Sequence, residues 1–169
     1  MIKYEITNEV HPLNSNFKRI RALRDIPAHD VKAGDIGGYI QSERNLDQEG
    51  DAWVGDGACV YGNARVYDEA LVFGKARVFG DARVYNEALV FGNARVFGNA
   101  WVYRNARVFG DPRVYGHAQV YGHAQVYGHA WVFGNASVSG DARVFDDAEV
   151  YGNARVSGNV EVSGDKEVS

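Results

Sequence analysis

The side chains best suited to chemistry are three histidines, His117, His123 and His129, each in a copy of Gly-His-Ala. A neutral imidazole can act as a general base or bind a metal ion. Neighbouring copies are six residues apart, so what they can do depends on how the chain folds between them. His11 and His29 lie outside this segment and have no visible partner motif.

A valine occupies every sixth position from Val54 to Val168 without interruption, which makes 20 hexads. A common hexad is Ala94-Arg95-Val96-Phe97-Gly98-Asn99, and such a short fixed period predicts a parallel β-helix. Alanine and valine alternate with the residue between them, so they face inward, while arginine and the aromatic residue face outward. Glycine followed by Asn, Asp or His predicts a bend. We therefore expect a four-residue strand and a two-residue bend in each hexad.

A second period of 18 residues defines the coil. The segment 68–74, Asp-Glu-Ala-Leu-Val-Phe-Gly, recurs at 86–92 with a single change. Three hexads per coil predict a triangular prism whose three faces are sheets. This arrangement places His117, His123 and His129 on three different corners of one coil. We therefore predict no catalytic residue and no metal site among them.

Outward side chains form rows, with one member per coil on each face. The first row pairs leucine with phenylalanine and forms what we call the Leu–Phe wall: Leu71, Phe73, Leu89, Phe91 and Phe109. The second has aromatic residues flanked by Arg77, Arg95 and Arg113. The third has four tyrosines, with Arg65 and Arg83 beside them: Tyr67, Tyr85, Tyr103 and Tyr121. Stacking along these rows can stabilise the rod, but an apolar outward strip is also typical of an interface.

Residues 1–50 lack the period and are predicted to form an N-terminal β cap and lead-in, followed by the solenoid at 51–169. Within the cap, the segments 4–7 and 17–23 are predicted to be strands, and a hairpin is the arrangement considered for them. The glycine-rich segment 31–40 leads into the first coil. We expect the cap to cover the N-terminal edge of the sheets.

The hexads resemble those of the left-handed β-helix hexapeptide-repeat family, as in Val78-Phe79-Gly80-Asp81-Ala82-Arg83. Here Phe or Tyr usually replaces the small or acidic residue of the family's second position. The lead-in at 31–40, followed by Gly-Asp-Ala-Trp-Val at 50–54, is similar to the YdcK-like group of bacterial and phage hexapeptide proteins, which are labelled acetyltransferases largely on fold. The resemblance implies a left-handed helix and, as an activity, an acyl-CoA-dependent transferase with sites between the subunits of a trimer.

Composition limits the remaining functions. The chain has 169 residues, a formal net charge of −4 and a single cysteine, Cys59. An intramolecular disulfide is therefore excluded, and a strongly basic nucleic-acid-binding surface is not indicated. The first residues do not have the pattern of a signal peptide, and no apolar run is long enough for a membrane span, so a cytoplasmic location is expected.

These observations favour a non-catalytic β-solenoid scaffold or binding protein. It would self-associate, as a homo-oligomer, or bind a partner through the outward aromatic rows. A protein or glycan partner stays open, whereas nucleic acid is disfavoured and a membrane partner is not expected. We expect no cofactor. The alternative function is an acyltransferase that uses acetyl-CoA as a substrate.

Overall fold

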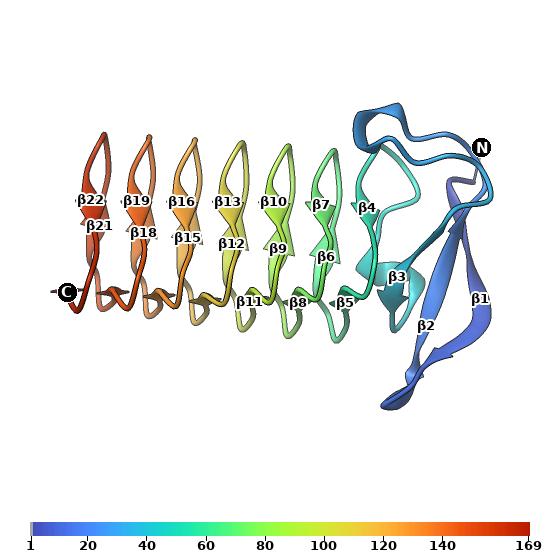
Figure 1. Ribbon diagram of the computed structural model, residues 1–169, viewed down its shortest axis with the longest axis horizontal. Helices are drawn as coiled ribbons and strands as arrows, with labels where there is room; N and C mark the ends of the chain where they lie inside the picture. Colours follow the sequence, from blue (N-terminus) through green and yellow to red (C-terminus); the bar gives the residue numbers. More distant parts are fainter. Residues whose placement is uncertain (1) are drawn as a thin grey trace.

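The computed structural model describes residues 2–169 as a straight parallel β-helix with a capping hairpin at its N-terminal end (Figure 1). Three sheets form the faces of the rod, which confirms the predicted fold class and the three hexads per coil. Strands pair in parallel with the strand 18 residues further along the chain, as Leu71 does with Leu89 and Arg95 with Arg113. Each outward row therefore lies along one face, parallel to the rod axis.

Sheet I has ten strands and includes the cap. Its strands, in spatial order, are β1 (Tyr4–His11), β2 (Asn14–Ala22), β3 (Ile36–Ile40), β5 (Cys59–Val60), β8 (Arg77–Val78), β11 (Arg95–Val96), β14 (Arg113–Val114), β17 (Trp131–Val132), β20 (Glu149–Val150) and β23 (Glu167–Val168).

Sheets II and III belong to the coils alone, with seven and six strands. Sheet II contains β4 (Trp53–Val54), β7 (Leu71–Val72), β10 (Leu89–Val90), β13 (Arg107–Val108), β16 (Gln125–Val126), β19 (Arg143–Val144) and β22 (Glu161–Val162). Sheet III contains β6 (Arg65–Val66), β9 (Arg83–Val84), β12 (Trp101–Val102), β15 (Gln119–Val120), β18 (Ser137–Val138) and β21 (Arg155–Val156).

The expectation of four-residue strands is wrong, because each solenoid strand has two residues. The bend begins directly after the aromatic residue, at a backbone conformation with positive φ, as at Gly98 (φ 69°). A Cβ added to Gly98 would lie 3.0 Å from the backbone nitrogen of Gly116 in the next coil, so glycine also allows the bends to stack closely. The aromatic residue still joins the ladder, since Phe97 N–H donates to Val114 O at 3.0 Å.

The core is a stack of alanine and valine side chains with no exposed surface through most of the rod, as at Ala94 and Val96. Pro112 takes one of the alanine positions and is also buried. Since one coil buries few atoms, stability comes from contacts between neighbouring coils.

The cap covers the N-terminal end of this core, as expected. Strands β1 and β2 form the predicted antiparallel hairpin, although both are longer than predicted at one end. Strand β3 then pairs in parallel with β5 and forms the first rung of sheet I. Two short 3₁₀ helices, η1 (Pro27–His29) and η2 (Glu43–Asn45), complete the cap.

Polar groups of the cap pair with backbone carbonyls of the first coil. Tyr39 N–H donates to Ala58 O at 2.8 Å, and the Asn45 side-chain amide donates to Ala64 O at 2.9 Å. The Lys3 ammonium is fully buried and donates to Ala52 O at 2.8 Å. These contacts satisfy carbonyls that would otherwise be unpaired at the end of the solenoid.

Within residues 2–169, no helix has the length and apolar character needed to cross a membrane.

Candidate functional site

The three aromatic rows predicted from the sequence are continuous stacks. In sheet I, the Phe79 and Phe97 ring centroids are 4.8 Å apart with planes 1° from parallel, and Tyr115 continues the stack at 4.9 Å. The stack of sheet III includes Tyr67 and Tyr85, whose ring centroids are 4.9 Å apart. Since neighbouring strands are about 4.8 Å apart, identical side chains in register meet face to face.

The stacked rings are half-buried by their neighbours, which supports a contribution to rod stability. Burial raises the pKa of Tyr67, Tyr85 and Tyr103 above the ordinary value for tyrosine. Phenolate formation is therefore disfavoured, and the hydroxyls stay neutral donors and acceptors at ordinary pH. This row presents neutral hydroxyl groups on the sheet III side of the rod.

The Leu–Phe wall lies on the sheet II side. Phe73, Phe91 and Phe109 stack with centroid separations of 4.8 and 5.0 Å, and Leu71 pairs in register with Leu89. All five side chains of the wall are half-buried in the single chain, so the strip is less exposed than the sequence suggests. The outer parts of the stacked rings and of the two paired leucines still form an apolar strip along sheet II.

The wall continues into a cleft against the cap. A cavity of about 340 Å³ lies between Trp53, Leu71 and Phe73 of the solenoid and Ile36 of the cap. Ile36 is one of the most exposed apolar side chains, at 49%. His29 also lines this cavity, and burial lowers its pKa. Asp35 and Asp56 line the cavity as well, so the surface beside the cap is mixed, with polar groups next to the apolar ones.

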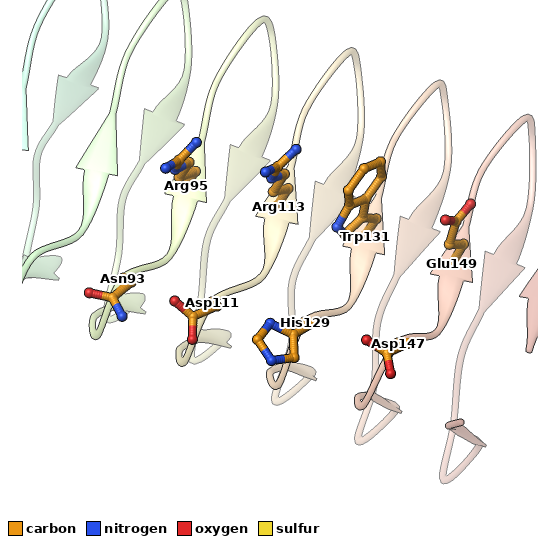
Figure 2. Close-up of a pocket in the computed structure, with 8 residues that line it drawn as sticks. All are labelled: Asn93, Arg95, Asp111, Arg113, His129, Trp131, Asp147 and Glu149. Atoms are coloured by element: carbon orange, nitrogen blue, oxygen red, sulfur yellow. The ribbon is translucent and has the colours of Figure 1, made fainter. Parts of the chain in front are cut away.

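A groove of about 540 Å³ follows sheet I near the middle of the rod (Figure 2). Figure 2 shows two rows of side chains along it, one from the strands and one from the bends. The strand row contributes Arg95, Arg113, Trp131 and Glu149, and the bend row contributes Asn93, Asp111, His129 and Asp147. The groove combines both signs of charge with one large aromatic surface.

The arginines of the strand row are stacked in register. Arg95 has Arg77 and Arg113 as its parallel neighbours. The Arg113 guanidinium lies 4.8 Å from the ring centroid of Trp131. Arg77 and Arg95 form no salt bridge among the residues that the structure describes. Because these two arginines have no acidic partner among the described residues, the row carries positive charge that is not neutralised. Like charges opposite each other on adjacent strands are destabilising.

Sheet III repeats part of this pattern. Arg83 lies over the ring of Trp101 at 5.2 Å, and Arg65 lies over Tyr67 at 5.5 Å. Both arginines are exposed, and each guanidinium lies within cation–π distance of an aromatic ring.

The three histidines lie apart, as predicted. His129 lines the groove of sheet I, whereas His117 lines a groove on sheet III and His123 one on sheet II. All three side chains are exposed at bends. Among residues 2–169, no group of three or more His, Cys, Asp or Glu side chains has the geometry to hold a metal ion.

Of the residues that line this groove, the sequence singled out Arg95, Arg113 and His129, but it did not bring them together or indicate the other five. Trp131 and Glu149 belong to the same 18-residue series as these arginines, and Asp111, His129 and Asp147 form the series two positions earlier. The signal was present, since comparing the chain with itself at a spacing of 18 brings both rows together.

Comparison with known proteins supports the repeat assignment. A family model described as the YdcK beta solenoid repeat matches the chain at residues 88–104, 124–140 and 148–164. A search of curated proteins gives no match. Each matched segment spans nearly one coil and lies within the regular part of the rod. The chain is therefore a β-solenoid repeat protein whose repeats resemble those of YdcK.

Proposed function

We propose that the protein is a non-catalytic scaffold that self-associates through the Leu–Phe wall of sheet II. The single observation that carries this proposal is the continuity of the wall, in which Phe73, Phe91 and Phe109 stack beside Leu71 and Leu89. A row of half-buried apolar side chains loses its remaining contact with water when a second surface covers it. No part of this role requires a reacting group.

The cleft beside the cap adds to the proposed surface. Ile36 and Phe73 line the same cavity, which is open to an incoming side chain. A side chain of a second subunit with an apolar stem and a polar end would suit this space, because Asp35 and Asp56 line it beside Ile36 and Phe73. Pockets that receive such anchors contribute strongly to association.

An acyltransferase needs a base close to the acceptor atom of its substrate. The three histidines of the solenoid line three separate grooves and are exposed, which favours a binding role over catalysis. The catalytic alternative makes a different prediction, namely saturable binding of acetyl-CoA.

The test uses Leu71→Glu with Leu89→Glu, which adds charges to the centre of the wall. The matched control is Gln119→Glu with Ser137→Glu, since these half-buried residues are also parallel neighbours in adjacent strands, on sheet III. Light scattering should show a lower mass for the wall variant than for the control, while both unfold at similar temperatures. Equal masses for the two variants would contradict the proposal.

A calorimetric titration with acetyl-CoA tests the alternative. We expect no saturable heat at millimolar ligand. Saturable binding that is lost when a histidine such as His129 is replaced by alanine would favour the acyltransferase.

A further inference from the structure

We propose that the outer face of sheet I is an interface between two copies of this chain, which lie antiparallel across it. The two-fold axis passes between the coils of Arg113 and Trp131, perpendicular to the rod. This interface is on a different face from the Leu–Phe wall and does not depend on the proposed function.

The strand row of sheet I is complementary to itself when reversed. From the N-terminal end the row carries three arginines, then one tryptophan, then two glutamates: Arg77, Arg95, Arg113, Trp131, Glu149 and Glu167. A two-fold axis between Arg113 and Trp131 places each arginine opposite a partner. Arg77 faces Glu167, Arg95 faces Glu149, and Arg113 faces Trp131 of the other copy.

The bend row gives the same axis independently. Its order along the rod is Lys75, Asn93, Asp111, His129, Asp147 and Asp165. Reversal about the same point places Lys75 opposite Asp165 and Asp111 opposite His129. Asn93 then faces Asp147, to which its side-chain amide can donate.

The symmetry operation keeps these rows aligned. A two-fold axis that lies in the interface, perpendicular to the rods, reverses the direction of one rod but keeps strand row against strand row. Each pair then occurs twice, as in any isologous dimer. The eight residues around the groove in Figure 2 consist of four such pairs. The charged, polar and aromatic side chains of the groove are therefore complementary to those of a second copy.

The single chain leaves charges in this row without partners. Arg77 and Arg95 stack in register and form no salt bridge within residues 2–169. In contrast, Arg143 and Glu161 are parallel neighbours on sheet II and form an ion pair at 3.4 Å. On sheet II the acidic partner of Arg143 comes from the same chain. For the arginines of sheet I, the acidic partners would come from the second copy.

Neither of the other faces has this property. The strand row of sheet III contains three arginines, Arg65, Arg83 and Arg155, and no acid, so no register can neutralise it. The strand row of sheet II has one acid, Glu161, which already pairs with Arg143. The charge pattern therefore selects sheet I.

The interface is small. Six coils, each about 4.8 Å high, and a face about four residues or 13 Å wide give roughly 400 Å² per copy. Interfaces of this size form weak complexes, and exposed ion pairs are screened by salt. We expect a dimer that forms at roughly 100 µM protein in low salt and dissociates as salt is added.

The test measures sedimentation in the Leu71→Glu, Leu89→Glu background, which removes the wall contact. Arg95→Glu alone and Glu149→Arg alone each place like charges opposite each other, and each should raise the dissociation constant roughly 30-fold or more. Arg107→Glu, in the same strand position on sheet II, should leave it unchanged.

Mixing the two single variants gives the decisive result. One copy then carries acids at 95 and 149 and the other carries arginines at both, so the antiparallel heterodimer has two attractive pairs again. The mixture should associate as strongly as the parent, which in this test is the Leu71→Glu, Leu89→Glu chain. Variants that had lost their fold could not regain association on mixing. A parent that stays monomeric, an Arg95→Glu variant that dimerises as the parent does, or a mixture that stays monomeric would each overturn the proposal.

Discussion

Phe97 lies between the rings of Phe79 and Tyr115, at centroid separations of 4.8 and 4.9 Å. Phe145, at the end of the row on sheet II, stacks on Tyr127 at 4.9 Å and has Ser163 in the next coil. Phe97→Ser therefore removes two stacking contacts and Phe145→Ser removes one. We expect losses of about 2 and about 1 kcal/mol in the free energy of unfolding, measured in urea. Equal losses would mean that stacking does not contribute.

The alanine and valine core should tolerate no charge. Val96 has no exposed surface and its neighbours in the stack are apolar, so Val96→Asp buries a carboxylate without a partner. We expect a loss of about 4 kcal/mol or more, with partial or complete unfolding seen by circular dichroism. Asn99→Asp is the control, since it adds the same charge at an exposed bend of the same coil. Similar stability of the two variants would contradict the assignment of the core.

The cap should make stability depend on pH. Burial, with a smaller contribution from the charge of Arg24, lowers the pKa of Lys3 to about 8. Between this value and the pKa of 10.5 for the unfolded chain, the unfolded state binds more protons, so stability rises with pH. We expect a gain of about 1 kcal/mol from pH 7 to pH 9 in urea unfolding.

Two other buried groups limit the pH range of that measurement. Burial raises the pKa of Cys59 and of Tyr4. The free energy of unfolding that these two groups contribute therefore falls as the pH rises beyond their ordinary pKa values of 9.0 and 10.0. The control is Lys3→Met, which removes the titrating amine and should abolish the rise below pH 9. The same rise in Lys3→Met would show that another group causes it.

The fold was predictable because the six-residue period recurs in every hexad. Inward Val96 and outward Arg95 alternate as the pleat of a strand requires, and the 18-residue recurrence determines the register. Strand length was not predictable in the same way. The positive φ at residues such as Gly98 begins the bend directly after the aromatic residue, and this shortens each strand to two residues.

The cap and the groove were harder to predict for physical reasons. Lys3 and Asn45 are buried polar residues whose partners are backbone carbonyls of the first coil, and a sequence does not identify which carbonyls are unpaired. The groove depends on the bend residues Asp111 and His129, which look like ordinary exposed bend residues when each hexad is considered alone. Only their alignment with Arg113 and Trp131 along the rod gives them a common role.

Self-association through the Leu–Phe wall is tested by the solution mass of the unmodified chain, here the parent, and of Leu71→Glu with Leu89→Glu. Both masses are measured by light scattering on a size-exclusion column. We expect a parent mass well above the 18.6 kDa of one chain and a clearly lower mass for the wall variant. A parent that elutes as a monomer at roughly 100 µM, or a trimer that keeps its mass in the wall variant and binds acetyl-CoA, would contradict self-association through the wall.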